Sequence, residues 1–284
     1  MSILVDENTK VLVIGITGRH GSFQTKKMIE YGTKIVGGVV PGKGNSYVHG
    51  VKVYNTVKEA LEEVEADFSI IFVPAKNAKL ACLESLENGL NIVVITEGMP
   101  IYDTLEVVNY AKKKNLIVIG PNSPGILSVD KCKIGIFPNN IAKKGKIGVV
   151  SRSGTLTYEI VSMLSRKNIG QTTIVGIGGD KIVGMNFVEV LEMFEKDDET
   201  EKVVLIGEIG GVMEEKAAEY IKAKFSKEVV AYIAGKKAPK EKPMGHAGAI
   251  IYGNIGTYES KVNALREAGV KVAENIFDIV KLLQ

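Results

Sequence analysis

A histidine with small neighbours is the first candidate for chemistry in this sequence. His246 lies in Lys242-Pro-Met-Gly-His-Ala-Gly-Ala249 and is one of three histidines among 284 residues. An imidazole titrates near neutral pH, and its unprotonated nitrogen is a nucleophile. Because no bulky residue adjoins it, His246 is either an ordinary loop histidine or an uncrowded carrier of a group such as phosphate.

Glycine-rich turns in the same half of the chain suit an anion. Ser151-Arg-Ser-Gly-Thr155 separates a strand-like run from an amphipathic run. There Ser153, Gly154 and Thr155 would open a helix whose amides and dipole cradle a phosphate. The alternative is ordinary N-capping by Ser153 or Thr155.

A carboxylate follows a later strand-like run of this half. Glu208 lies in Gly207-Glu-Ile-Gly-Gly211, and a similar turn, Gly176-Ile-Gly-Gly-Asp180, follows the preceding run. Ligands of open parallel sheets bind at the carboxyl ends of the strands, so these turns would share an edge. Glu208 would accept an imidazole N–H and leave the other ring nitrogen as the nucleophile, unless it is only a solvated turn acid.

The first half offers a second phosphate site. Gly15-x-x-Gly18-x-x-Gly21 resembles a dinucleotide turn, but Thr17 replaces the middle glycine. After the next strand-like run stands Lys43, where an NAD site has an acid. Lys43 favours a phosphate on the ribose, as in coenzyme A or NADP, although a plain turn with a surface lysine is the alternative. The near match to a Walker loop at 37–43 lacks its Ser or Thr and precedes an expected loop at 45–50, so we exclude a P-loop nucleotidase.

The pattern of apolar runs predicts an α/β protein of two doubly wound domains. Strand and helix patterns alternate, and strands that are apolar throughout are typical of parallel sheets covered on both faces. In the first half we expect strands at 11–14, 34–39, 68–73, 91–96 and 116–119, and helices at 22–31, 57–64, 78–88 and 104–114. In the second half we expect strands at 146–150, 172–177, 203–207, 228–233 and 270–272, and helices at 155–166, 186–194, 214–224, 258–268 and 276–283. The turn-dense stretch between them predicts domains at 1–122 and 146–284, joined by a connecting segment at 123–145.

Composition excludes several classes of protein. A net charge of +3 with scattered lysines does not indicate nucleic-acid binding. Two cysteines, without a Cys-x-x-Cys pair, argue against a disulfide framework or zinc site, so we expect no metal site and a reducing cytoplasm. Charged residues near the start argue against a signal peptide, and no run is long and apolar enough to span a membrane.

Eight strings, taken together and in order, resemble a known family. They are Thr17-Gly-Arg-His20, Val39-Val-Pro-Gly-Lys-Gly44, Ile95-Thr-Glu-Gly98, Gly120-Pro-Asn-Ser-Pro-Gly125, Ser151-Arg-Ser-Gly-Thr-Leu-Thr-Tyr-Glu159, Gly176-Ile-Gly-Gly-Asp180, Gly207-Glu-Ile-Gly-Gly211 and Met244-Gly-His-Ala-Gly-Ala249. They resemble the alpha subunit of succinyl-CoA synthetase (succinate–CoA ligase), over essentially the whole chain.

The resemblance implies a role for each matching residue. It implies a Rossmann-like CoA-binding domain followed by a flavodoxin-like domain that carries a transiently phosphorylated histidine, here His246. Glu208 matches the acid that positions this histidine, and Tyr158 matches a substrate position. The implied phosphate-binding residues are Ser153, Gly154 and Thr155, and the implied CoA contacts are Thr17, Gly18, Arg19, His20, Lys43, Ile95, Thr96 and Glu97.

The resemblance also implies a reaction of the tricarboxylic acid cycle and a partner. Succinate, CoA and ATP or GTP would give succinyl-CoA, a nucleoside diphosphate and phosphate, reversibly, through succinyl phosphate and phosphohistidine. An ATP-grasp beta subunit would bind the nucleotide with Mg²⁺, in an αβ or α₂β₂ assembly, and the isolated chain would bind CoA without turnover.

Two departures from the family pattern leave alternatives open. Ser123 stands where many members have a cysteine, so a thiol is not required there, and Arg19-His20 replaces smaller or neutral residues. His20 is a minor rival of His246 as phosphate acceptor. The alternative functions are a sister ligase for malate or acetate, an NADP-dependent oxidoreductase, and a non-catalytic CoA-binding protein.

Overall fold

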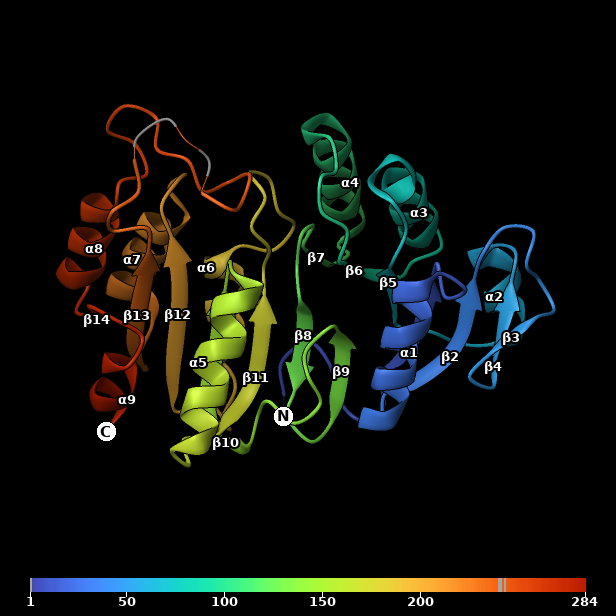
Figure 1. Cartoon of the computed structure of the whole chain (residues 1–284), viewed down its shortest axis with the longest axis horizontal. Coiled ribbons are helices and arrows are strands. Elements are labelled where there is room, and N and C mark those ends of the chain that lie inside the picture. Colours follow the sequence, from blue (N-terminus) through green and yellow to red (C-terminus); the bar gives the residue numbers. More distant parts are fainter. Residues whose placement is uncertain (1, 240–241, 243) are drawn as a thin grey trace. The chain divides into compact units, whose positions relative to one another are not determined.

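The chain forms two compact units in a computed structural model that describes residues 2–239, 242 and 244–284 (Figure 1). The N-terminal unit comprises Val5–Asn139 with Ile182–Gly184, and the C-terminal unit comprises the remaining described residues. Pro243, in the stretch around His246, lies outside the described residues. Each unit is described separately below.

The N-terminal unit is a Rossmann-like sheet. The strands run in the order β3-β4-β2-β1-β5-β6-β7, and all pairs are parallel except β3 with β4. The strands are β1 (Lys10–Ile14), β2 (Lys34–Val39), β3 (Tyr47–Val48), β4 (Val51–Tyr54), β5 (Phe68–Ile71), β6 (Asn91–Val94) and β7 (Val118–Ile119). The helices are α1 (Arg19–Tyr31), α2 (Val57–Glu63), α3 (Ala75–Glu87) and α4 (Ile101–Lys114). Without the short β3, the order is the 3-2-1-4-5-6 of dinucleotide-binding folds.

Its core explains why the expected elements form. Strands β1, β5 and β6 are apolar on both faces, and a continuous cluster joins them to the buried sides of α2, α3 and α4. The sequence places these strands within two residues of the observed bounds, because a run that is buried on both faces has no polar positions to obscure it.

Two short antiparallel pairings differ from the sequence expectation. Tyr47–Val48 was expected to be loop but forms β3, which pairs with β4, a strand that the sequence expectation also lacked. The turn-dense stretch after β7 contains a hairpin of β8 (Gly125–Ser128) and β9 (Cys132–Gly135). Strands this short carry no readable alternation, and their pairing partners, rather than their composition, decide their conformation.

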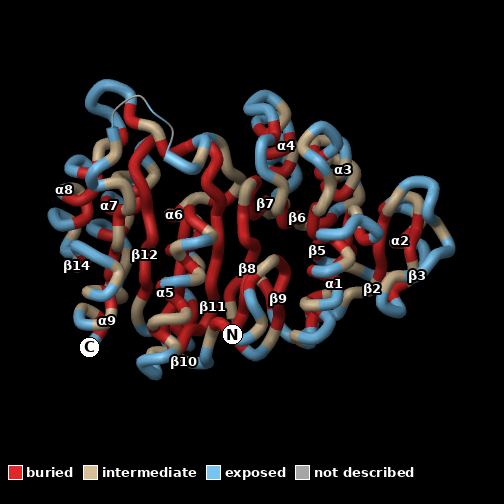
Figure 2. Tube along the Cα trace, in the orientation of Figure 1, coloured by how far each residue is buried: buried red, intermediate tan, exposed pale blue. Residues whose placement is uncertain are grey.

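The C-terminal unit is flavodoxin-like. Its parallel strands run in the order β11-β10-β12-β13-β14, which is 2-1-3-4-5 in chain order. They are β10 (Lys144–Ser151), β11 (Gln171–Gly176), β12 (Lys202–Glu208), β13 (Glu228–Ala234) and β14 (Lys271–Ala273). The helices are α5 (Gly154–Arg166), α6 (Phe187–Glu195), α7 (Met213–Lys224), α8 (Tyr258–Glu267) and α9 (Asp278–Leu283). Figure 2 shows β11 and β12 buried over most of their length.

The strand order creates a switch point in the C-terminal unit. From β10 the chain crosses to β11 on one side and later returns to β12 on the other side. The connections that leave the neighbouring strands β10 and β12 therefore run in opposite directions along the sheet. In doubly wound sheets, ligands bind at switch points of this kind. The loop after β10 begins at Arg152 and the last residue of β12 is Glu208, so the fold brings these two parts of the sequence together.

A buried lysine ties β9 of the N-terminal unit to the segment that follows it. The Lys133 ammonium group donates to the Phe137 carbonyl (2.9 Å) and to the Asn139 side-chain oxygen (2.5 Å). Asn139 in turn donates to the Lys27 carbonyl of α1 (2.9 Å). Burial, followed by the positive charge of Lys27, lowers the pKa of Lys133 to about 8.

This shift predicts a pH dependence of stability. Between pH 8 and the ordinary lysine pKa of 10.5 the unfolded chain binds a proton that the folded chain does not, so stability should rise with pH. The free energy of unfolding of the wild type, minus that of Lys133→Met, should increase by up to about 1.4 kcal/mol per pH unit in this window. Urea unfolding at several pH values measures the difference, and a difference independent of pH would contradict the assignment.

Candidate functional site

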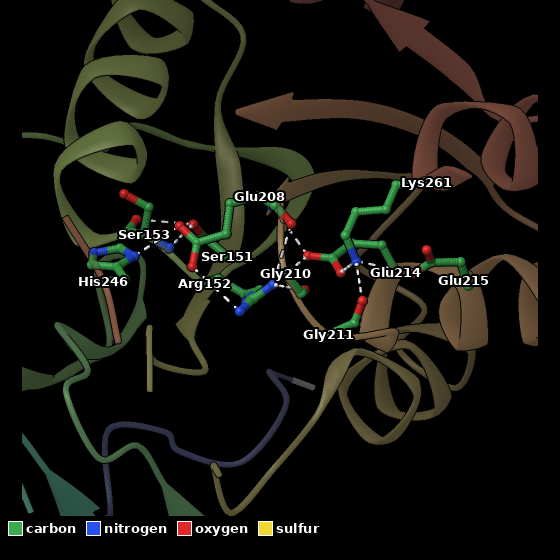
Figure 3. A network of polar contacts seen from close by, with 10 residues as sticks. All are labelled: Ser151, Arg152, Ser153, Glu208, Gly210, Gly211, Glu214, Glu215, His246 and Lys261. Carbon is green, nitrogen blue, oxygen red and sulfur yellow. Dashed lines mark hydrogen bonds and ion pairs between the residues drawn. The ribbon is translucent and has the colours of Figure 1, made fainter. Parts of the chain in front are cut away.

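The central contact of the C-terminal unit joins His246 to Glu208. Their Nδ1 and Oε2 atoms lie 2.7 Å apart, with Glu208 buried and a quarter of the His246 side chain exposed (Figure 3). A carboxylate only accepts hydrogen bonds, so Nδ1 carries the proton and Nε2 keeps its lone pair. This arrangement suits an imidazole that acts as a nucleophile through Nε2 while an acid holds Nδ1.

Three glycines allow the His246 turn to lie this close. A Cβ at Gly179 would stand 2.6 Å from the imidazole Cγ and Nδ1 atoms, and one at Gly248 would stand 2.8 Å from Arg152 Nη2. Gly248 also donates its amide to the Gly179 carbonyl (3.0 Å). Gly210 adopts a positive φ of 93°, and a Cβ there would stand 2.1 Å from the Gly248 carbonyl. Gly179 therefore packs directly against the ring, and Gly248 and Gly210 let the three glycine-containing strings pack closely against one another.

The N-terminus of α5 has the form expected of an anion site. Ser153 is the N-cap and accepts the Leu156 amide (3.4 Å), while its own amide donates to Ser151 Oγ (3.0 Å). The amides of Gly154 and Thr155 belong to the first turn, where no helical carbonyl is available to them. Both readings of this turn, capping and anion cradle, are therefore compatible with its geometry.

Tyr158 lies one turn further along α5. Its side chain is partly buried, and burial raises the pKa of the phenol to about 12. It therefore stays a neutral hydroxyl at physiological pH.

Behind Glu208 lies a set of buried charges that we call the inner charge cluster: Arg152, Glu214 and Lys261. Arg152 Nη1 donates to Glu214 Oε1 (3.0 Å) and to the carbonyls of Gly210 (3.0 Å) and Glu208 (3.2 Å). Lys261 Nζ lies 2.5 Å from the other Glu214 oxygen. Figure 3 follows these contacts from His246 to Lys261.

The cluster keeps its charges despite burial. Burial opposes ionisation of Glu214, but Arg152 and Lys261 outweigh it and lower the pKa of this carboxyl. Burial likewise opposes the charge on Arg152, but Glu214 and Glu208 outweigh it and raise the pKa of the guanidinium. The sequence interpretation missed all three residues, because Glu214 and Lys261 look like surface charges on helices α7 and α8.

In the N-terminal unit, the predicted CoA residues gather at the carboxyl edge of the sheet. Thr17, Gly18, Arg19 and His20 follow β1, Lys43 follows β2, and Ile95, Thr96 and Glu97 follow β6. Gly18 is the N-cap of α1 without a side-chain capping bond, and the first turn of α1 contains no acid. The His20 ring packs edge-on against Phe72, with centroids 5.4 Å apart.

Further polar contacts shape the turns of this edge. The Asn55 side-chain oxygen accepts the amides of Gly42 and Gly44 (3.0 Å each) and so holds the turn that presents the exposed Lys43. Thr96 Oγ1 donates to the Val73 carbonyl (2.7 Å), which joins the turns after β6 and β5. The sequence interpretation missed both Asn55 and the turn after β5, since neither carries a motif.

Comparison with known proteins decides the family. Residues 6–98 match the CoA-binding domain model and residues 150–271 match the CoA-ligase model. The succinate–CoA ligase [ADP-forming] subunit alpha 1 of Archaeoglobus fulgidus is 56% identical, covering 99% of this chain and 97% of its own. The chain belongs to the succinate–CoA ligase alpha-subunit family. The Staphylococcus aureus (strain Mu50) member, also named as a subunit alpha, is 54% identical over 96% of this chain and 91% of its own.

A solved structure shares the fold. ATP citrate lyase from Methanothrix soehngenii, in complex with citrate and coenzyme A, superposes with a TM-score of 0.90 at 27% identity. The match covers 99% of this chain but 50% of the lyase, so this chain spans about half the length of that protein.

Two features are absent from the part of the chain that the structure describes. No group of three or more His, Cys, Asp or Glu side chains in this part of the chain is arranged to hold a metal ion. In the same residues, no helix is both long enough and apolar enough to cross a membrane.

The packing of Gly179 under the ring gives a test of the site. Gly179→Ala should push the imidazole off Glu208, because the added Cβ would lie 2.6 Å from the ring. The expected result is loss of the hydrogen-bonded Nδ1 proton resonance in ¹H NMR, with the far-UV circular dichroism spectrum unchanged. Gly253→Ala is the control: its Cβ would meet no atom within 4 Å, so it adds the backbone strain of a φ of 59° but no contact with the ring, and the resonance should be retained. A retained resonance in Gly179→Ala would contradict this geometry.

Proposed function

We propose that this chain is the alpha subunit of a succinate–CoA ligase and that His246 carries the phosphoryl group. The observation that carries the proposal is the 2.7 Å contact between His246 Nδ1 and Glu208 Oε2, which supports a proton on Nδ1 and a nucleophilic Nε2. A CoA-binding domain and a CoA-ligase domain in one chain of this family support it.

The proposed reaction uses one nitrogen twice. Nε2 attacks the γ-phosphorus, the N–P bond forms, and the P–O bond to the nucleoside diphosphate breaks with its electron pair leaving on oxygen. A succinate carboxylate oxygen then attacks phosphorus, and the N–P electron pair returns to Nε2. The CoA thiolate finally attacks the carbonyl of succinyl phosphate, and phosphate leaves. Glu208 holds the Nδ1 proton throughout and stabilises positive charge on the ring.

The remaining site residues have supporting roles in this proposal. Ser153, Gly154 and Thr155 would bind the phosphoryl group at the α5 N-terminus, where amides and the helix dipole favour an anion. Tyr158, a neutral hydroxyl, would contact the acid substrate.

CoA would bind at the carboxyl edge of the N-terminal sheet. The uncapped amides of α1 and the side chains of Arg19 and His20 suit its pyrophosphate, and Lys43 suits its ribose phosphate. Thr17, Gly18, Ile95, Thr96 and Glu97 would complete the contacts along the same edge. Domains at 1–122 and 146–284 with a connection at 123–145 remain our assignment.

The other half of the active site would come from a second protein. We propose an ATP-grasp beta subunit that binds ATP or GTP with Mg²⁺, in an αβ or α₂β₂ assembly; names of relatives as subunit alpha support a partner. A cytoplasmic location remains a prediction, with which the free, buried Cys82 and Cys132 agree.

Labelling tests the carrier. The assembled enzyme incubated with γ-labelled ATP or GTP should form acid-labile phosphohistidine, and His246→Asn should abolish it because no nucleophile replaces Nε2. His49→Asn, in the N-terminal unit, is the control and should label normally. Label that persists in His246→Asn would sink the proposal and point to His20.

A second variant tests the CoA site. Lys43→Ala should raise the KM for CoA by loss of one charge-assisted phosphate contact, about 1.5–3 kcal/mol or roughly 10- to 150-fold. Lys113→Ala, at the C-terminal end of α4, should leave it unchanged. An unchanged KM for CoA together with a changed KM for nucleotide would contradict the assignment of the CoA site to the N-terminal unit. Assays with succinate, malate, acetate and both nucleotides identify the substrates.

A further inference from the structure

The inner charge cluster lies directly behind the acid that holds His246. The side chains of Glu214 and Lys261 are completely buried, and that of Arg152 is 1% exposed. Buried charges contribute little net stability, because desolvation opposes their attraction. Their contacts instead concern the position and charge of Glu208.

We propose that Arg152, Glu214 and Lys261 are positioning residues that hold Glu208 against His246 and set how much negative charge the imidazole feels. The proposed effect of the inner charge cluster on the orientation and protonation of His246 is argued from geometry alone. Only its consequence for phosphoryl transfer rests on the proposed function.

The cluster holds Glu208 from two directions. Glu214 Oε1 accepts both the Glu208 amide (3.1 Å) and Arg152 Nη1 (3.0 Å). Arg152 Nη1 also donates to the Glu208 carbonyl (3.2 Å). Backbone amide and carbonyl of the acid are therefore held by the same pair of side chains.

The side chain of Glu208 is shared between two partners. Its Oε2 faces His246 Nδ1 at 2.7 Å, whereas its Oε1 lies 3.4 Å from Arg152 Nη2 in an ion pair without a hydrogen bond. The positive guanidinium is therefore close enough to offset part of the negative charge of the Glu208 carboxylate. Because the guanidinium is also paired with Glu214, it offsets less of that charge than an unpaired arginine would.

The charges alternate with distance from the ring. Behind Glu208 come the positive Arg152, the negative Glu214, the positive Lys261 and, at 3.0 Å from Lys261, the negative Glu215. Removing a negative member should disfavour proton binding by the imidazole, and removing a positive member should favour it. A purely structural role would not produce opposite signs.

Other charged groups near the turn stay constant in such a comparison. Asp180 follows β11, and its carbonyl borders Gly248; Lys181, next to it, donates to the Tyr252 hydroxyl (3.2 Å). Glu215 is also held by Ser260 (2.9 Å). None of them is altered in the variants that follow.

The test is an NMR titration of the ring protons of the full chain. In Glu214→Gln the midpoint of the His246 titration should move to lower pH, and in Lys261→Met to higher pH, each by about one unit for a single charge at an effective dielectric near 20. The double variant should return close to the wild type. His246→Asn identifies the resonance, and His20 and His49 serve as internal references.

Matched controls separate charge from folding. Glu228→Gln and Lys271→Met remove an ion pair (3.2 Å) at the opposite end of β13 and should not move the midpoint. Lys261→Arg retains the charge and should titrate like the wild type, so the pair Lys261→Met and Lys261→Arg decides the question even if Glu214→Gln fails to fold. Shifts of the same sign in Glu214→Gln and Lys261→Met, or no shift in Lys261→Met, would overturn the proposal.

The labelling reaction separates this inference from the proposed function. In the assembled enzyme, the pH profile of His246 labelling should shift with the titration midpoint in each variant. Opposite midpoint shifts in a chain that is never labelled would support the cluster and overturn the phosphoryl transfer. Normal labelling in variants whose titration midpoint does not move would support the phosphoryl transfer and overturn the role of the inner charge cluster.

Discussion

The ion pair between Arg152 and Glu214 is the constraint on which the arrangement of the C-terminal unit around His246 depends. It joins the residue after β10 to the first turn of α7, across the switch point of the sheet. Gly248, in the His246 turn, packs directly against the same guanidinium, since a Cβ there would lie 2.8 Å from Arg152 Nη2. The ends of β10 and β12, the start of α7 and the His246 turn therefore all meet at the buried Arg152 side chain. Among the described residues, removing Glu214 would leave Arg152 with only the 3.4 Å ion pair to Glu208, and removing Arg152 would leave Glu214 with the ion pair to Lys261 alone, so either loss should cost more than the pair itself stabilises.

The two units share a strand–turn–helix arrangement that suits an anion. In both, a β-strand ends at a glycine-containing turn and a helix begins with uncapped or weakly capped amides, at α1 in one unit and α5 in the other. The difference lies in what surrounds the turn. Around α1 the side chains are exposed and basic, which suits a large ligand with several phosphates. Beside α5 an imidazole, a buried acid and close-packed glycines suit a small group that is held briefly and passed on.

Much of the fold was predictable, and the errors have physical causes. Strands such as β1 and β12, buried on both faces, are apolar at nearly every position and cannot be mistaken for surface segments. The β3 strand and the β8–β9 hairpin were missed because their few residues gain their conformation from a neighbouring strand. Glu214 and Lys261 were missed because charged residues on a helix normally face solvent, and only the packing of α7 against α8 buries them.

The sequence by itself determined the alternation of strands and helices, the glycine turns at strand ends, and the residues His246, Glu208 and Lys43 as candidates. These follow from local periodicity, from the conformational freedom of glycine and from side-chain chemistry. Only the tertiary structure decided that Glu208 contacts His246, that Gly179 packs against the ring, and that Arg152, Glu214 and Lys261 lie behind the acid. The reason is that local periodicity does not reveal strand order, and strand order determines which of the loops at the carboxyl edge become neighbours.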